Sequence, residues 1–178
     1  MSELLACAGD FALLIETPAH ASGSDFAIQL RDDFDFIKYE TENEILEIIR
    51  SFENGTISRE NWKHAEHLTV AYYYIEHSPL LIEATDKMRV GIFNLLKSFG
   101  VDLEKEMPYH ETMTRFWMKV IFDFGKIKNG YSVVEVTNLI LDNFNDKDLP
   151  LKFYSRELLF SEAARKDFVE PDLEEFPR

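Results

Sequence analysis

Apolar side chains recur every three or four residues from position 41 onward, and this spacing limits what the chain can fold into more than any other feature does. Between residues 42 and 52 it places Ile45, Ile49 and Phe52 on one side of a helix, which an Asn-Gly pair ends. The same spacing predicts long helices over residues 58–77, 79–99, 109–125 and 132–144, and two short helices after residue 149. We therefore expect an all-α fold, a compact bundle of five to six helices.

The first forty residues do not share this spacing. Phe26, Ile28 and Leu30 alternate with polar neighbours, as they would in a short extended segment. We expect residues 1–40 to form an irregular or extended N-terminal arm that packs its aromatic side chains against a helical domain of residues 41–178. A chain of 178 residues is long enough to bury the core of one such domain.

The charge of the chain limits its partners. It carries 33 acidic and 19 basic residues, a formal net charge of -14 at pH 7. Such a surface repels the phosphates of nucleic acids and the heads of anionic lipids. We therefore expect a small-molecule partner and neither nucleic acid nor membrane; formation of a homo-oligomer is left open.

A single cysteine, Cys7, excludes an intramolecular disulfide and favours a reducing compartment. Residues 4–15 form an apolar stretch near the N-terminus, but no basic segment precedes it, Asp10 interrupts it, and it is too short to span a bilayer. We expect a cytoplasmic protein without a targeting segment.

Two histidines stand out in the helix expected over residues 58–77. His64 and His67 fall on the same side as Leu68, whereas Glu66 and Thr69 are expected to project outward. A buried imidazole must be satisfied by a metal, a ligand or a hydrogen bond. The histidine pair therefore indicates a site.

His110 begins the fourth predicted helix on its apolar side, so antiparallel packing of two helices would bring three imidazoles together. Three nitrogens suit Zn, Fe, Mn or Ni, and an open coordination position would make the centre catalytic. Glu111 would be the fourth ligand or the general base. The leading hypothesis is thus a divalent-metal protein with His64, His67 and His110 as ligands, which catalyses metal-assisted hydrolysis or oxidation.

Cationic residues suggest how such a site would hold an anionic small molecule. Arg89 in the third helix, or Arg156 with its neighbour Tyr154, would bind a carboxylate of the ligand. A salt bridge to one of the many acids is the alternative for each arginine.

Two further hypotheses remain open. One is a non-catalytic small-molecule-binding or regulatory module, in which the histidines hydrogen-bond the ligand. The other is a structural protein that oligomerises through aromatic helices and uses the histidines as hydrogen-bonding core residues.

Three blocks of sequence resemble a family of small bacterial helical proteins without an assigned activity. The blocks are Trp62-x-His64-x-x-His67-Leu68, then Tyr109-His110-Glu111-Thr112-x-Thr114, and Tyr154-Ser155-Arg156-x-Leu158-x-x-Ser161-x-x-Ala164-Arg165. The similarity extends over about residues 41–173. It implies that the histidines, Glu111 and Arg156 share one pocket, and it implies no mechanism.

Overall fold

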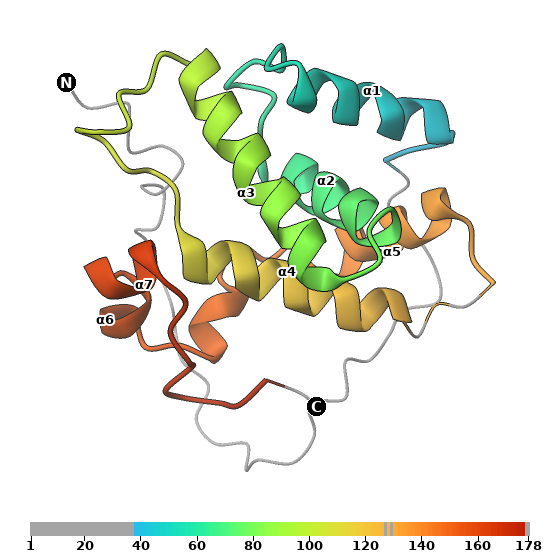
Figure 1. Ribbon diagram of the computed structural model, residues 1–178. Coiled ribbons are helices and arrows are strands. Elements are labelled where there is room, and N and C mark those ends of the chain that lie inside the picture. The colour runs from blue at the N-terminus through green and yellow to red at the C-terminus, as the bar shows by residue number, and fades with distance from the viewer. Residues whose placement is uncertain (1–37, 127, 129, 177–178) are drawn as a thin grey trace.

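The computed structural model describes residues 38–126, 128 and 130–176, which form a bundle of helices without a strand (Figure 1). The long helices are α1 (Glu42–Glu53), α2 (His64–Glu76), α3 (Leu81–Ser98), α4 (Glu111–Lys126) and α5 (Val133–Asn143). The C-terminal part holds the 3-10 helix η1 (Leu149–Lys152) and the short helices α6 (Arg156–Leu159) and α7 (Glu162–Lys166). The all-α prediction is confirmed. The arm predicted for residues 1–40 lies almost wholly outside the described residues.

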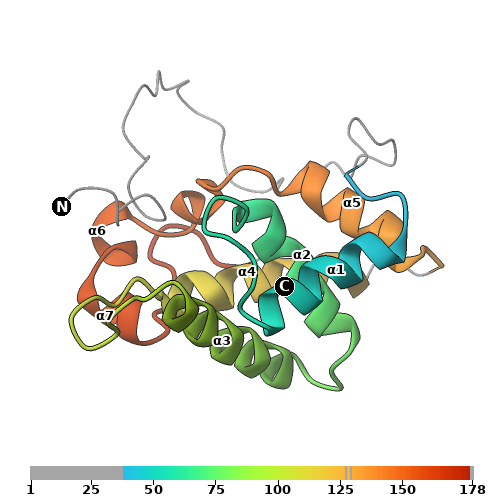
Figure 2. The ribbon, with the colours of Figure 1, turned by 90° about the horizontal axis from the view of Figure 1, so that it is seen from above.

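Helix α2 lies at the centre of the bundle and contacts α1, α3, α4 and α5 (Figure 1 and Figure 2). Because it has neighbours on several sides, the consecutive residues from Leu68 to Tyr72 are all buried. The single inward stripe expected from the sequence is therefore wrong for this helix. Glu66 and Thr69, expected to project outward, are both buried.

The start of α2 also differs from the prediction. Residues 58–63 form a turn, and the helix begins at His64 rather than at Ser58. Trp62 stacks on Phe52 of α1, with ring centroids 4.7 Å apart. This contact holds the chain against α1 immediately before α2 begins. The spacing of apolar residues along the sequence gives no sign of such a contact.

A buried asparagine anchors the chain where it enters the bundle. Asn138 of α5 accepts hydrogen bonds from the backbone N–H groups of Lys38 and Tyr39, each at 3.0 Å, and donates to the carbonyl of Tyr39 at 2.8 Å. The Tyr39 hydroxyl also shares a 3.2 Å hydrogen bond with Thr69 of α2. These bonds fix Lys38 in place beside α2 and α5.

Serine side chains cap the later helices. Ser132 and Glu135 form a reciprocal capping box at the start of α5. The hydroxyls of Ser155 and Ser161 accept hydrogen bonds from the first turns of α6 and α7. The two short helices pack at one end of the bundle, where α7 contacts α4 (Figure 1). Within the described ranges, no helix combines the length and the apolarity needed to cross a bilayer.

Candidate functional site

His64, the first residue of α2, links two helices. Its Nε2–H donates to the carbonyl of Phe144, the C-cap of α5, at 2.8 Å. Its ring meets the ring of Trp117 edge-on, with centroids 4.7 Å apart. The last carbonyls of a helix have no partner within that helix. The imidazole therefore caps the C-terminus of α5.

His110, immediately before α4, caps the C-terminus of α6 in the same way. Its Nε2–H donates to the carbonyl of Leu159, the last residue of α6, at 2.8 Å. Its Nδ1 accepts a hydrogen bond from the backbone N–H of Met113 at 3.3 Å. Both ring nitrogens are thus engaged, and the bonds require the neutral ring with its proton on Nε2.

His67 bonds within its own helix. Its Nδ1–H donates to the carbonyl of Lys63 at 2.8 Å, and its ring packs on Trp62 with centroids 4.1 Å apart. This ring therefore makes its contacts at the N-terminal end of α2.

The three imidazoles do not converge. His64 lies against Trp117, which is two helical turns beyond His110, roughly 10 Å along α4. The described part of the chain contains no group of three or more His, Cys, Asp or Glu side chains that could hold a metal ion. The metal centre predicted from His64, His67 and His110 is therefore not supported.

Burial lowers the pKa of all three imidazoles. Desolvation lowers the pKa of His67 to about 4, against the opposing effect of its bond to Lys63. Desolvation also lowers the pKa values of His64 and His110, and the positive charges of Lys147 and Arg165, respectively, act in the same direction. Each ring is therefore held neutral, as a donor to one carbonyl.

Glu111, the predicted catalytic carboxylate, is paired. Arg89 donates from Nε to Oε2 at 2.9 Å and from Nη2 to Oε1 at 2.5 Å, and the Tyr109 hydroxyl donates to Oε2 at 2.6 Å. Burial opposes ionisation of Glu111, but the bonds from Arg89 and Tyr109 outweigh it and lower the pKa. A general base near neutral pH needs a raised pKa. The salt bridge left as the alternative for Arg89 is thus confirmed.

The other predicted ligand-binding residues are engaged separately. Arg156 is exposed and lies over the ring of Phe160 at 5.3 Å. Tyr154 is fully buried, and its hydroxyl donates to the carbonyl of Val169 at 3.1 Å. These contacts hold the C-terminal helices in place and do not present a pocket wall with Arg89.

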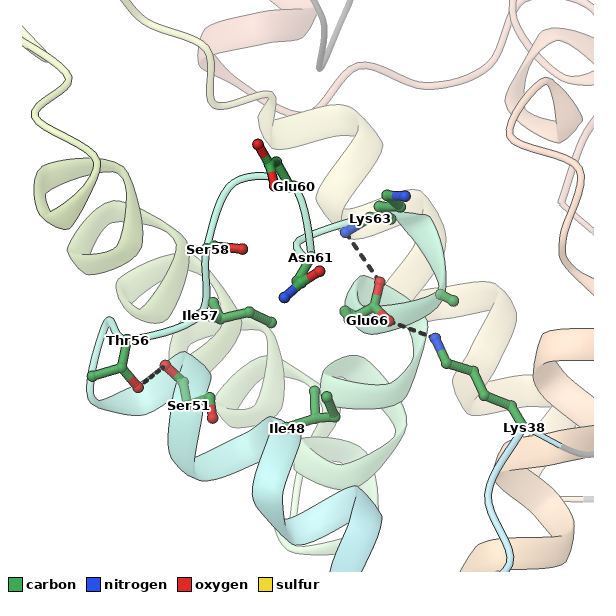
Figure 3. Close-up of a pocket in the computed structure, with 11 residues that line it drawn as sticks. Lys38, Ile48, Ser51, Thr56, Ile57, Ser58, Glu60, Asn61, Lys63 and Glu66 are labelled. Carbon is green, nitrogen blue, oxygen red and sulfur yellow. Dashed lines mark hydrogen bonds and ion pairs between the residues drawn. The ribbon is translucent and has the colours of Figure 1, made fainter.

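A groove of about 580 Å³ lies between α1 and the start of α2 (Figure 3). In Figure 3 the side chains of Ile48, Ile57 and Asn61 point toward the space between them. The hydroxyl-bearing residues Ser51 and Ser58 also line it. Most of the lining residues are polar or charged, and Ile48, Ile57 and Ala65 are the apolar ones. The volume falls within the range of small-molecule sites.

Four of the residues that line the groove are charged: Lys38, Glu60, Lys63 and Glu66. Glu66 is 8% exposed, and its two carboxylate oxygens have different partners. Oε1 accepts from Lys38 Nζ at 2.5 Å, and Oε2 accepts from the backbone N–H of Lys63 at 3.1 Å. Glu66 therefore caps α2 and forms a charged wall of the groove.

Lys38 and Glu66 are not among the site residues predicted from the sequence. For Glu66 a signal was present, because a glutamate at the third position of a helix commonly caps the N-terminus. Placing the helix start at Ser58 hid that signal. Lys38 has no local signal, since its carboxylate partner is 28 positions further along the chain.

No protein-family model, curated protein or solved structure matches this chain. The resemblance carried by the three sequence blocks stays a prediction. The structure does join the second block to the third, through the bond from His110 to Leu159. In the first block, His64 instead contacts α5 and Trp117, and His67 contacts Lys63 and Trp62.

Proposed function

We propose that this protein is a non-catalytic module that binds a small polar molecule in the groove between α1 and α2. The observation that carries the proposal is Glu66, a buried carboxylate on the groove wall whose charge Lys38 balances at 2.5 Å. Burial of an unpaired ion costs several kcal/mol. Because Lys38 pairs with Glu66, the groove wall holds both charges in fixed positions without that cost. A cytoplasmic location, which the single cysteine favours, is part of the proposal.

The state of the other candidate residues supports binding over catalysis. Glu111 is ionised and held by Arg89, and His110 uses both ring nitrogens in hydrogen bonds to the backbone. The groove combines apolar and polar lining with a volume suited to a metabolite.

Thermal denaturation of the full chain with a metabolite panel tests the proposal. The panel holds amino acids, sugars, nucleosides and small carboxylic acids. A ligand at one hundred times its Kd stabilises the folded state by about 2.7 kcal/mol, which raises the Tm by several degrees. We expect at least one compound to raise the Tm and Asn61→Trp, which fills the groove, to remove that rise.

The matched control is Asn43→Trp, an exposed asparagine of α1 outside the groove, which should keep the wild-type response. The proposal fails if no compound stabilises the protein, or if both tryptophan variants respond like wild type. Stabilisation by Zn²⁺ alone, lost in His64→Gln, would favour the histidine metal centre instead.

A further inference from the structure

The exposed side of α3 carries a regular pattern of charged and apolar residues. The opposite side of the helix packs on α1, α2 and α4, and α3 lies along one edge of the bundle in Figure 2. Glu83, Asp86, Val90, Asn94 and Lys97 are all exposed. They are three or four residues apart, so they form one stripe along the helix, the outer face of α3.

Val90 is the middle residue of this face, and its side chain is 57% exposed. Glu83 comes seven residues before it and Lys97 seven residues after it. Seven residues make nearly two turns, so both lie within about 20° of Val90 around the helix and about 10.5 Å from it along the axis, in opposite directions. One negative and one positive charge therefore lie at equal distances on either side of an exposed apolar residue.

These two charges have no charged partner in the described part of the chain. Neither Glu83 nor Lys97 forms an ion pair with a described residue. The other charged side chains near them are engaged, because Asp86 pairs with Arg89 and Lys87 donates hydrogen bonds to the C-terminal end of α2. Glu83 and Lys97 are therefore the charges that the outer face of α3 offers to a partner.

The face is complementary to itself when two copies of the helix run antiparallel. A twofold rotation that places Val90 beside Val90 of a second copy also places Glu83 of each copy beside Lys97 of the other. We infer that the outer face of α3 is a docking surface for a second copy of this chain, with the two α3 helices antiparallel. A parallel pair would set Glu83 against Glu83 and Lys97 against Lys97, which like-charge repulsion disfavours.

The dimer formed in this way should be weak. A single helix face is small compared with the roughly 1,600 Å² that a standard protein–protein interface buries. The two copies also repel each other, since each carries a formal net charge of -14. At about 0.15 M salt this repulsion is screened beyond roughly 8 Å, whereas charges in contact are screened less. We therefore expect a dimer that dissociates on dilution.

Sedimentation equilibrium of the full chain at about 0.15 M salt tests the inference. We expect the average mass to rise with protein concentration from that of one chain toward that of two. Val90→Asp sets two carboxylates against each other at the centre of the contact and should abolish this rise. Because Val90 is exposed, the circular dichroism of this variant should match that of wild type. A wild-type chain that stays a monomer up to millimolar concentration, or a Val90→Asp variant that associates like wild type, overturns the inference.

Charge reversal tests the antiparallel arrangement. Glu83→Lys and Lys97→Glu each set like charges together at both ends of the contact, and each should weaken association at least about tenfold. Their combination in one chain restores opposite charges and should return the affinity to within about threefold of wild type. An equimolar mixture of the two single variants should also associate, since each supplies the charge that the other lacks. Single variants that associate like wild type, or a combination as weak as the single variants, overturn the inference.

Glu47→Lys and Lys152→Glu are the matched controls. They change the net charge by the same amounts at exposed positions outside the outer face of α3 and should leave association unchanged. Losses equal to those of the α3 variants would show that net charge alone governs association, and would overturn the inference. The outer face of α3 shares no residue with the groove between α1 and α2, so these outcomes are independent of the proposed function.

Discussion

Arg89 donates two hydrogen bonds to the carboxylate of Glu111, one to each oxygen, and so links α3 to α4. The Glu111 side chain is 9% exposed and that of Arg89 29%. Arg89 also bonds Asp86 one turn earlier on its own helix. The sequence suggests ligand binding for Arg89 and catalysis for Glu111. In the structure their side chains instead link two helices.

Removal of Arg89 should destabilise the fold. Arg89→Met leaves the buried Glu111 without its charge partner, and we expect a loss of about 3 kcal/mol in the free energy of unfolding. Urea unfolding followed by circular dichroism measures it. Lys97→Met, on the exposed side of the same helix, should cost less than about 0.5 kcal/mol.

A double-mutant cycle checks the cause. Arg89→Met combined with Glu111→Leu should cost less than the sum of the single changes, because no unpaired charge remains buried. Additive losses would contradict the proposed link.

Loss of the cap at His110 should loosen the C-terminal helices. His110→Ala removes the donor to Leu159 and the acceptor for Met113, and we expect a loss of about 1–3 kcal/mol. Amide hydrogen exchange should become faster over residues 156–166. The matched control is His77→Ala, an exposed histidine that bonds the carbonyl of Tyr73 within α2, with an expected loss below about 0.5 kcal/mol. Equal losses in the two variants would rule out a special role for His110.

Acid should destabilise the protein through its neutral histidines. Burial lowers the pKa values of His64, His67 and His110 below the ordinary 6.5, so the unfolded chain binds protons more readily than the folded one. The contribution of these rings to stability is therefore complete above pH 6.5. It is lost as the pH falls toward 4, the pKa of His67.

Urea midpoints measured between about pH 7.5 and pH 4.5 check this dependence. The midpoint should fall steadily below pH 6.5, and His67→Gln should flatten the curve relative to wild type. A midpoint in wild type that stays constant down to pH 5 would show that the rings are not held neutral.

Substitution of Asn138 should lower the free energy of unfolding more than substitution of Asn143, the other asparagine of α5. Asn138→Ala leaves two backbone N–H groups and one carbonyl of residues 38 and 39 without their partners, and we expect a loss of about 3 kcal/mol. Chemical denaturation measures it. In Asn143→Ala a single bond to Leu139 is lost, and about 1 kcal/mol is expected. Similar losses in both variants would argue against an anchor at Asn138.

Much of the helical architecture could be predicted from the sequence because its causes are local. The spacing of Ile45, Ile49 and Phe52 predicts α1, and the spacing of apolar residues over 132–144 predicts α5. Caps and periodicity act over a few residues, so most of their effects can be predicted without knowledge of the tertiary structure. The start of α2 differs from the prediction, because Trp62 stacks on Phe52 and residues 58–63 form a turn before the helix.

The candidate site depended on contacts between distant residues. Periodicity places two histidines on one side of a helix, but an imidazole N–H is satisfied equally by a carbonyl or by a ligand. In the packed structure His64 donates to the carbonyl of Phe144, 80 positions away, and His110 donates to that of Leu159, 49 positions away. Packing also brings Lys38 to Glu66. The sequence by itself therefore determined the all-α fold and the approximate extent of most of its helices. Tertiary structure alone decided which polar groups meet, because a side chain's partner depends on the helices packed around it.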